Sequence, residues 1–94
     1  MAVIEVETFT LVGEVSVETF HSLDEQTQEW CYLNRPGIAR RTLAVDANGK
    51  FIVVTLFSEA SQADAGYRNY AGISKEWLSC IAEGSTTHEV FSLF

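Results

Sequence analysis

The chain has 94 residues, of which 47% are hydrophobic and 20% are charged, and its formal net charge is −7. This length and composition indicate a single globular domain over residues 1–94. The acidity argues against a nucleic-acid or anionic-membrane partner, because both require a basic surface. We recognise no signal peptide and no membrane-spanning run, and therefore expect a cytoplasmic protein.

The first segments predict a strand followed by a helix. Residues 3–11 are rich in β-branched and aromatic side chains in partial alternation, which is typical of a strand. Ser16 stands where a helix N-cap is expected, and Val15 and Phe20 have the spacing of a hydrophobic staple around it.

The middle of the chain predicts the end of this helix and then a hairpin. The helical spacing continues to about Leu33, and residues 34–37, Asn-Arg-Pro-Gly, are helix breakers. Residues 38–45 and 51–57 predict two strands. The sequence Asp-Ala-Asn-Gly-Lys between them favours a tight turn, so the two strands should pair in antiparallel fashion.

The last part predicts a second helix and a fourth strand. Ser58 or Ser61 can cap a helix whose apolar stripe continues through residue 81, with Gly72 inside it and Gly84 as its stop. Residues 87–94 predict the final strand. The order β-α-β-β-α-β is that of a ferredoxin-like α+β fold, a four-stranded antiparallel sheet with two helices on one face.

The third predicted strand raises the question of what covers the other face of this sheet. Residues 51–57, Phe-Ile-Val-Val-Thr-Leu-Phe, are apolar on both alternating sides, whereas two helices cover only one. A second copy packed face to face would bury the rest, so we expect a homodimer with an interface of roughly 2,000 Å² or more. We expect that interface to include one alternating set, namely Phe51, Val53, Thr55 and Phe57.

Residues 32–65 resemble the dimeric α/β-barrel superfamily, and within it the group related to antibiotic-biosynthesis monooxygenases. The matching features are Pro36-Gly37 before the second strand, the turn at residues 46–49, Phe57 at the end of the third strand, and Ala63 and Ala65 at the start of the second helix. This resemblance implies the ferredoxin-like fold, pairing of two protomers into a barrel, and a pocket between the sheet and the helices of each protomer.

The resemblance also implies a range of activities. The superfamily includes cofactor-free oxygenases that act on aromatic or polyketide-like molecules, and haem-degrading enzymes whose haem-ligating histidine lies on the second helix. The corresponding position here is near Trp77, which cannot ligate iron, and the two histidines, His21 and His88, lie elsewhere. We therefore expect neither haem nor any other cofactor.

Three aromatic residues of the second helix share one face. Tyr67, Tyr70 and Trp77 follow at helical spacing, which is the ordinary pattern of a core stripe. Their polar tips nevertheless require hydrogen-bond partners when they are buried, so the same stripe can line a pocket for a small apolar or aromatic ligand.

Two carboxylates and one histidine are the acid–base candidates. Glu5 and Glu7 are two residues apart on the first strand and therefore point to one face, and His88 on the last strand should lie beside that strand. Ion pairing with arginines would explain the carboxylates without any catalytic role. The catalytic hypothesis assigns proton transfer to His88, Glu7 and Tyr67, with ligand contacts from Tyr67, Tyr70, Trp77 and Glu5.

The remaining motifs add little chemistry. Cys31 and Cys80 lie far apart and are expected to be reduced core residues, and no clustered metal-ligand spacing occurs, so we expect no metal site. Two functions remain open: a small cofactor-independent monooxygenase-like enzyme, and a non-catalytic module that binds a small ligand or serves as a stress-type accessory protein.

Overall fold

A computed structural model describes residues 1–63 and 75–94 of the chain. Its elements, in chain order, are β1 (Val3–Thr10), α1 (Val17–Asn34), β2 (Ile38–Val45), β3 (Lys50–Phe57), the 3₁₀ turn η1 (Ala60–Gln62), α2 (Lys75–Ser79) and β4 (Thr87–Ser92).

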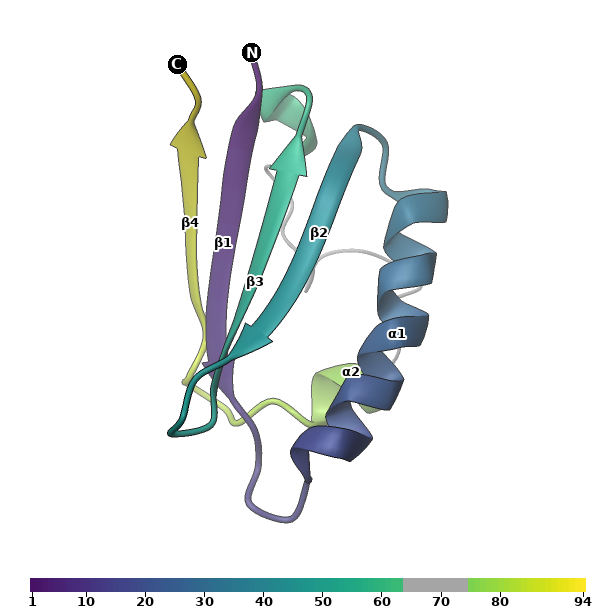
Figure 1. The fold of residues 1–94 in the computed structure, drawn as a ribbon, viewed down its shortest axis with the longest axis vertical. Helices are drawn as coiled ribbons and strands as arrows, with labels where there is room; N and C mark the ends of the chain where they lie inside the picture. The colour runs from purple at the N-terminus through teal and green to yellow at the C-terminus, as the bar shows by residue number, and fades with distance from the viewer. Residues whose placement is uncertain (64–74) are drawn as a thin grey trace.

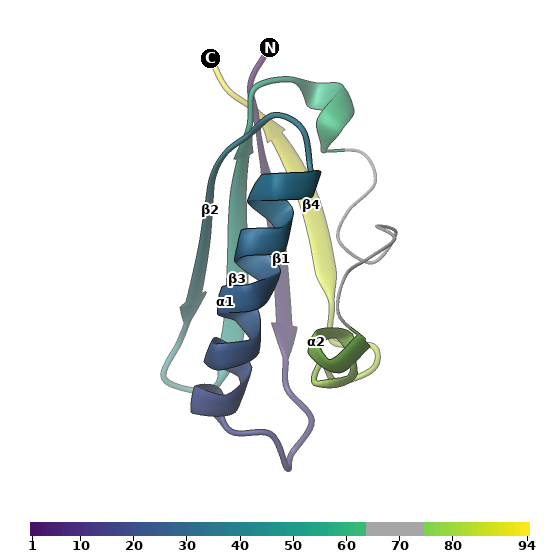
Figure 2. The same ribbon diagram turned by 90° about the vertical axis from the view of Figure 1, so that its right-hand side faces the viewer.

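The four strands form one antiparallel sheet in the order β2-β3-β1-β4, with β1 and β3 at its centre. Both helices lie on the same side of this sheet (Figures 1 and 2). The predicted ferredoxin-like fold is therefore confirmed. The N-terminus and the C-terminus lie at the same end of the sheet (Figure 1), where the Leu93 N–H donates to the carbonyl oxygen of Ala2 at 3.1 Å.

Helix α1 begins as its sequence predicts. The Ser16 hydroxyl accepts a hydrogen bond from the backbone N–H of Thr19 at 3.1 Å, which satisfies one of the unpaired donors of the first turn. Val15 and Phe20 both belong to the core beside it. The helix ends at Asn34, and the Arg35 N–H still reaches the carbonyl oxygen of Cys31 at 2.8 Å.

The β2–β3 turn is held by one carboxylate. Asp46 Oδ1 accepts from the backbone N–H groups of Asn48 at 2.8 Å and Lys50 at 2.9 Å, and Gly49 adopts a φ of 84°. The donor at Lys50, followed by that at Asn48, lowers the pKa of Asp46 because both favour its charged form. The turn predicted at residues 46–50 is thus confirmed in detail.

The hydrophobic core lies between the sheet and the helices. Its centre is an aromatic cluster in which Phe9 packs edge-on against Phe20 and Trp77 and is stacked on Phe51, with ring centroids 5.7–5.8 Å apart. The Phe20 and Phe51 rings also meet at 5.0 Å. Such aromatic pairs add stability beyond their buried area.

The prediction of which β3 residues form the interface was wrong, because it chose the residues of the opposite face. Phe51, Val53, Thr55 and Phe57 are all buried, and they point toward the helices of their own protomer. The open face instead carries Ile52, Val54 and Leu56, which are half-buried. Both alternating sets are mostly apolar, so only the packing of α1 and the pairing with β1 distinguish them.

The second predicted helix agrees only in part with the structure. Around Ser61 the chain forms η1, and α2 ends at Ser79, two residues before the expected end, because Ile81 pairs with Leu11 in an isolated β-bridge. Residues 64–74 of the predicted helix lie outside the described part of the chain. None of the described helices is long and apolar enough to cross a membrane.

Candidate active site

Glu5 and Glu7 both point from β1 toward the helix-covered face of the sheet. Glu5 is fully buried and Glu7 is 4% exposed, although both belong to a central strand whose neighbouring positions Val3 and Phe9 are core residues. The prediction that the two carboxylates share a face is confirmed. Burying two carboxylates is costly unless cations or hydrogen-bond donors accompany them.

His88 approaches these carboxylates from the edge strand β4. It stands directly opposite Glu7 in the register of β1 and β4, yet its Nε2 atom lies 3.0 Å from Glu5 Oε2. One ligand atom from each of Glu5, Glu7 and His88 lies within 4.8 Å of the others. The His88 side chain is 36% exposed, so the imidazole connects the buried Glu5 carboxylate to the surface.

Arg35 supplies the cation beside this cluster. Its Nη1 atom donates to Glu5 Oε1 at 3.5 Å, and its guanidinium carbon lies 4.8 Å from the centre of the Phe57 ring. The Arg35 side chain is fully buried. The sequence did not predict this role, because Arg35 precedes Pro36 in a helix-breaking segment, where an arginine is ordinarily an exposed loop residue.

A second buried polar network joins α1, β2 and α2. Asp24 accepts two hydrogen bonds from the guanidinium of Arg41, at 2.7 and 2.9 Å, and a third from the indole N–H of Trp77 at 3.0 Å. Gln28 Oε1 also accepts from Arg41 at 3.2 Å. A bidentate pair of this kind fixes both partners, so the network ties the helices to the edge strand.

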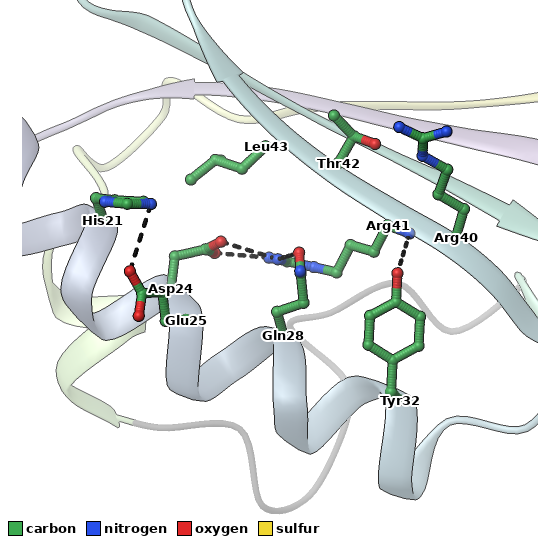
Figure 3. A pocket seen from close by; sticks show the side chains of 9 residues that line it. All are labelled: His21, Asp24, Glu25, Gln28, Tyr32, Arg40, Arg41, Thr42 and Leu43. Atoms are coloured by element: carbon green, nitrogen blue, oxygen red, sulfur yellow. Dashed lines mark hydrogen bonds and ion pairs between the residues drawn. The ribbon is translucent and has the colours of Figure 1, made fainter.

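A groove of about 450 Å³ runs between α1 and the edge strand β2, and nine residues line it (Figure 3). Arg41 points from β2 toward Asp24 and Gln28 on the helix, whereas Arg40 and Thr42 point to the other side of the strand (Figure 3). On the helix, His21 and Glu25 are exposed and form an ion pair at 3.6 Å. The lining is mostly polar and does not include Glu5, Glu7 or His88, although Arg41 stands in the same cross-strand row as Glu5, since both pair with Thr55 of β3.

Tyr32 occupies one backbone N–H group of the edge strand β2 in this groove. Its hydroxyl oxygen accepts the backbone N–H of Arg41 at 2.7 Å (Figure 3). An N–H on an edge strand is otherwise free to pair with a strand of another molecule. The groove is therefore best explained as the place where α1 packs against the edge strand β2. The cluster of Glu5, Glu7 and His88 is the stronger candidate for a catalytic site.

The predicted aromatic stripe is described only at its last member. Trp77 is fully buried within the aromatic cluster and bonds to Asp24, which is the environment of a core residue. Tyr67 and Tyr70 lie outside the described residues.

Both cysteines are free and buried, as predicted. Burial raises the pKa of the Cys31 thiol and also that of Cys80, because the charged thiolate is poorly solvated there. Raised pKa values favour the less reactive thiol form of both groups, which agrees with a role in packing.

The arrangement suits proton transfer. In its contact with Glu5, His88 uses Nε2, which leaves Nδ1 to take or give a proton. A carboxylate in this position can stabilise an imidazolium, and Arg35 donates to the other oxygen of that carboxylate.

Solved structures similar to this chain have related folds. SnoaB, a cofactor-independent oxygenase from Streptomyces nogalater, matches as its N63A mutant at 18% identity and a TM-score of 0.71, over 98% of this chain and 92% of that chain. A protein described as an antibiotic biosynthesis monooxygenase matches at 11% identity and a TM-score of 0.71, over 98% of both chains.

A third similar structure is a dimeric protein of unknown function with a ferredoxin-like fold from Bacteroides fragilis NCTC 9343. It matches at 13% identity and a TM-score of 0.67, over 98% of this chain and 96% of that chain. No family model matches the sequence, and neither does any curated protein. The chain therefore has the ferredoxin-like fold that antibiotic biosynthesis monooxygenase-like proteins share, as its sequence predicted.

Proposed function

We propose that this protein is a small cofactor-independent monooxygenase-like enzyme that acts on an aromatic or polyketide-like molecule. The observation that carries the proposal is the contact of 3.0 Å between His88 Nε2 and the buried Glu5 Oε2. The likeness in fold to a cofactor-independent oxygenase supports it, although fold alone does not determine function.

The proposed chemistry begins with removal of a proton from an electron-rich substrate. His88 takes the proton, and Glu5 stabilises the resulting imidazolium, while Glu7 adds a second negative charge nearby. The substrate carbanion forms a carbon–oxygen bond with O₂. The resulting peroxide loses water and leaves a carbonyl, so that a CH₂ group and O₂ give C=O and H₂O. The residues supply the base and the site, and the substrate supplies the electrons.

Two proposed ligand contacts lie outside the described part of the chain. Tyr67 and Tyr70 remain proposed ligand contacts, on the basis of their helical spacing with Trp77. The change Tyr67→Phe keeps the ring and deletes the hydroxyl, so a loss of ligand binding at unchanged stability would support that role.

The experiment compares the two histidines of the chain. Oxygen consumption is measured with anthrone-type substrates, which carry the activated CH₂ group that the proposed chemistry requires, for the unmodified protein, His88→Gln and His21→Gln. We expect His88→Gln to lower kcat by about 10²–10⁴-fold, the usual contribution of a general base. The exposed His21 is the matched control and should leave kcat unchanged. Equal rates in all three proteins would refute the proposal, and ligand binding without turnover would favour the non-catalytic module.

We also propose that a second copy of the chain covers the open face of the sheet. Ile4 pairs with Leu56 and Val6 with Val54, which places an apolar strip along the two central strands. The surrounding edges carry opposite charges on the same face, Arg40 on β2 and Glu89 on β4. A two-fold arrangement that brings β2 of one copy beside β4 of the other lets these charges pair, and it removes both sheet edges.

A further inference from the structure

The cluster of Glu5, Glu7 and His88 has the composition of a metal-binding site. Glu5 and Glu7 come from β1 and His88 from β4, and their nearest ligand atoms lie within 4.8 Å of one another. The strands bring together residues that are far apart in the sequence, which is why no metal-ligand spacing was visible there.

The donor set suggests which ions would fit. One imidazole nitrogen and two carboxylate oxygens are ligands that Zn²⁺ and similar divalent transition metals accept, at bonds of about 2.0–2.2 Å. Ligand atoms around such an ion lie roughly 3.0–3.5 Å apart. His88 Nε2 and Glu5 Oε2 already have this separation, at 3.0 Å. The Glu7 carboxylate, whose nearest ligand atom lies within 4.8 Å of the other two, would have to move closer to complete the set.

The surroundings hold the donors in place. Glu5 and Glu7 are buried on a central strand, where sheet pairing fixes the backbone. Arg35 donates to Oε1 of Glu5, so it orients the carboxylate while Oε2 remains on the side of His88. The partly exposed imidazole gives an ion access from solvent.

We propose that Glu5, Glu7 and His88 bind one divalent transition-metal ion of the Zn²⁺ class. A bound ion would occupy the nitrogen and oxygen atoms that the proposed proton transfer uses. The ion is therefore an inhibitor of the activity, and this consequence, unlike the binding itself, rests on the proposed function.

The binding test uses Zn²⁺ in isothermal titration calorimetry and Co²⁺ as an absorbing probe. We expect one ion per chain, a visible Co²⁺ band, and affinity weakened at least tenfold in both Glu7→Gln and His88→Gln. His21→Gln is the matched control and should bind as the unmodified chain does. Because His88 lies on the exposed edge strand, its variant remains informative even where Glu7→Gln fails to fold.

Absence of binding, or equal affinity in His88→Gln, would overturn the metal site. The oxygen-consumption assay separates it from the proposed function. Zinc that binds at this site and stops turnover supports both the metal site and the assignment of His88 as the base. Turnover that continues with zinc bound leaves the metal site standing and shows that the base assignment is wrong.

Discussion

The two faces of the sheet differ in where they carry charged and apolar side chains. The face covered by the helices carries buried charges, Glu5, Glu7 and Arg41, among its core residues. The open face carries an apolar strip along its two central strands, made up of Ile4, Val6, Ile52, Val54 and Leu56. Soluble monomers rarely leave a contiguous apolar patch uncovered, and they rarely bury charged side chains that are not paired.

The two proposals assign different tasks to the two faces. Burial of an apolar strip yields about 25 cal/mol for each Å², so covering the open face with a second copy stabilises the assembly. Buried charges on the covered face are costly unless they are paired, and we propose that Glu5 and Glu7 serve chemistry there. Under these proposals, adjacent residues of β1 serve association and chemistry separately.

The largest expected effect comes from a charge placed in the covered face. Val53 is 1% exposed within the core cluster, so Val53→Asp buries a carboxylate among apolar side chains. We expect a loss of several kcal/mol, comparable with the whole stability of a small domain. Far-UV circular dichroism and urea titration measure it, and a native-like urea midpoint would contradict the assignment of this face.

The neighbouring change on the open face should behave differently. Val54→Asp places the same charge on the apolar strip, outside the core clusters. We expect the protomer to keep its circular dichroism spectrum while the dimer dissociates, because only the interface is disturbed. Size-exclusion chromatography with light scattering tests this. A variant that stays dimeric would place the interface elsewhere.

Trp77 tests how far the aromatic cluster stabilises the covered face. Trp77→Ala should lower the free energy of unfolding by about 3–5 kcal/mol, since the ring is fully buried. Trp77→Phe keeps most of the ring and removes the N–H that reaches Asp24, so a smaller loss of about 1–3 kcal/mol is expected. Urea denaturation gives both values, and equal losses would show that ring packing contributes little.

The smallest effect concerns the turn at the end of the hairpin. The pKa of Asp46 is lowered in the folded chain, so the stability that its carboxylate contributes is present above the ordinary pKa of 3.8 and is lost as pH falls through the lower folded value. Asp46→Asn keeps an acceptor oxygen but cannot titrate. The urea midpoint of the unmodified chain should therefore fall more between pH 7 and pH 3 than that of the variant.

Much of the fold was predictable because its signals are local. The Ser16 cap, the breakers after α1 and the Asp46 turn each depend on a few adjacent residues, and all three agree with the structure. The shared face of Glu5 and Glu7 followed from strand periodicity alone. Predicting that they lie close to His88 required only the strand order of the ferredoxin-like fold, which places β4 beside β1.

The failures have one physical origin, which is packing between distant segments. Strand β3 is apolar on both sides, so its sequence cannot state which side meets the helices, and the chosen set was the wrong one. Arg35 and Asp24 resemble ordinary polar residues at a helix end and on a helix, and only their partners on β1, β2 and α2 show their importance.

Sedimentation velocity of the unmodified chain at micromolar concentration tests the central claim most directly, namely that the apolar open face is an interface. A chain of 10.5 kDa that pairs through this face should sediment with twice that mass, and Val54→Asp should return it to the mass of one chain. A stable, folded species of 10.5 kDa in the unmodified protein would contradict the account, because its apolar strip would then face water.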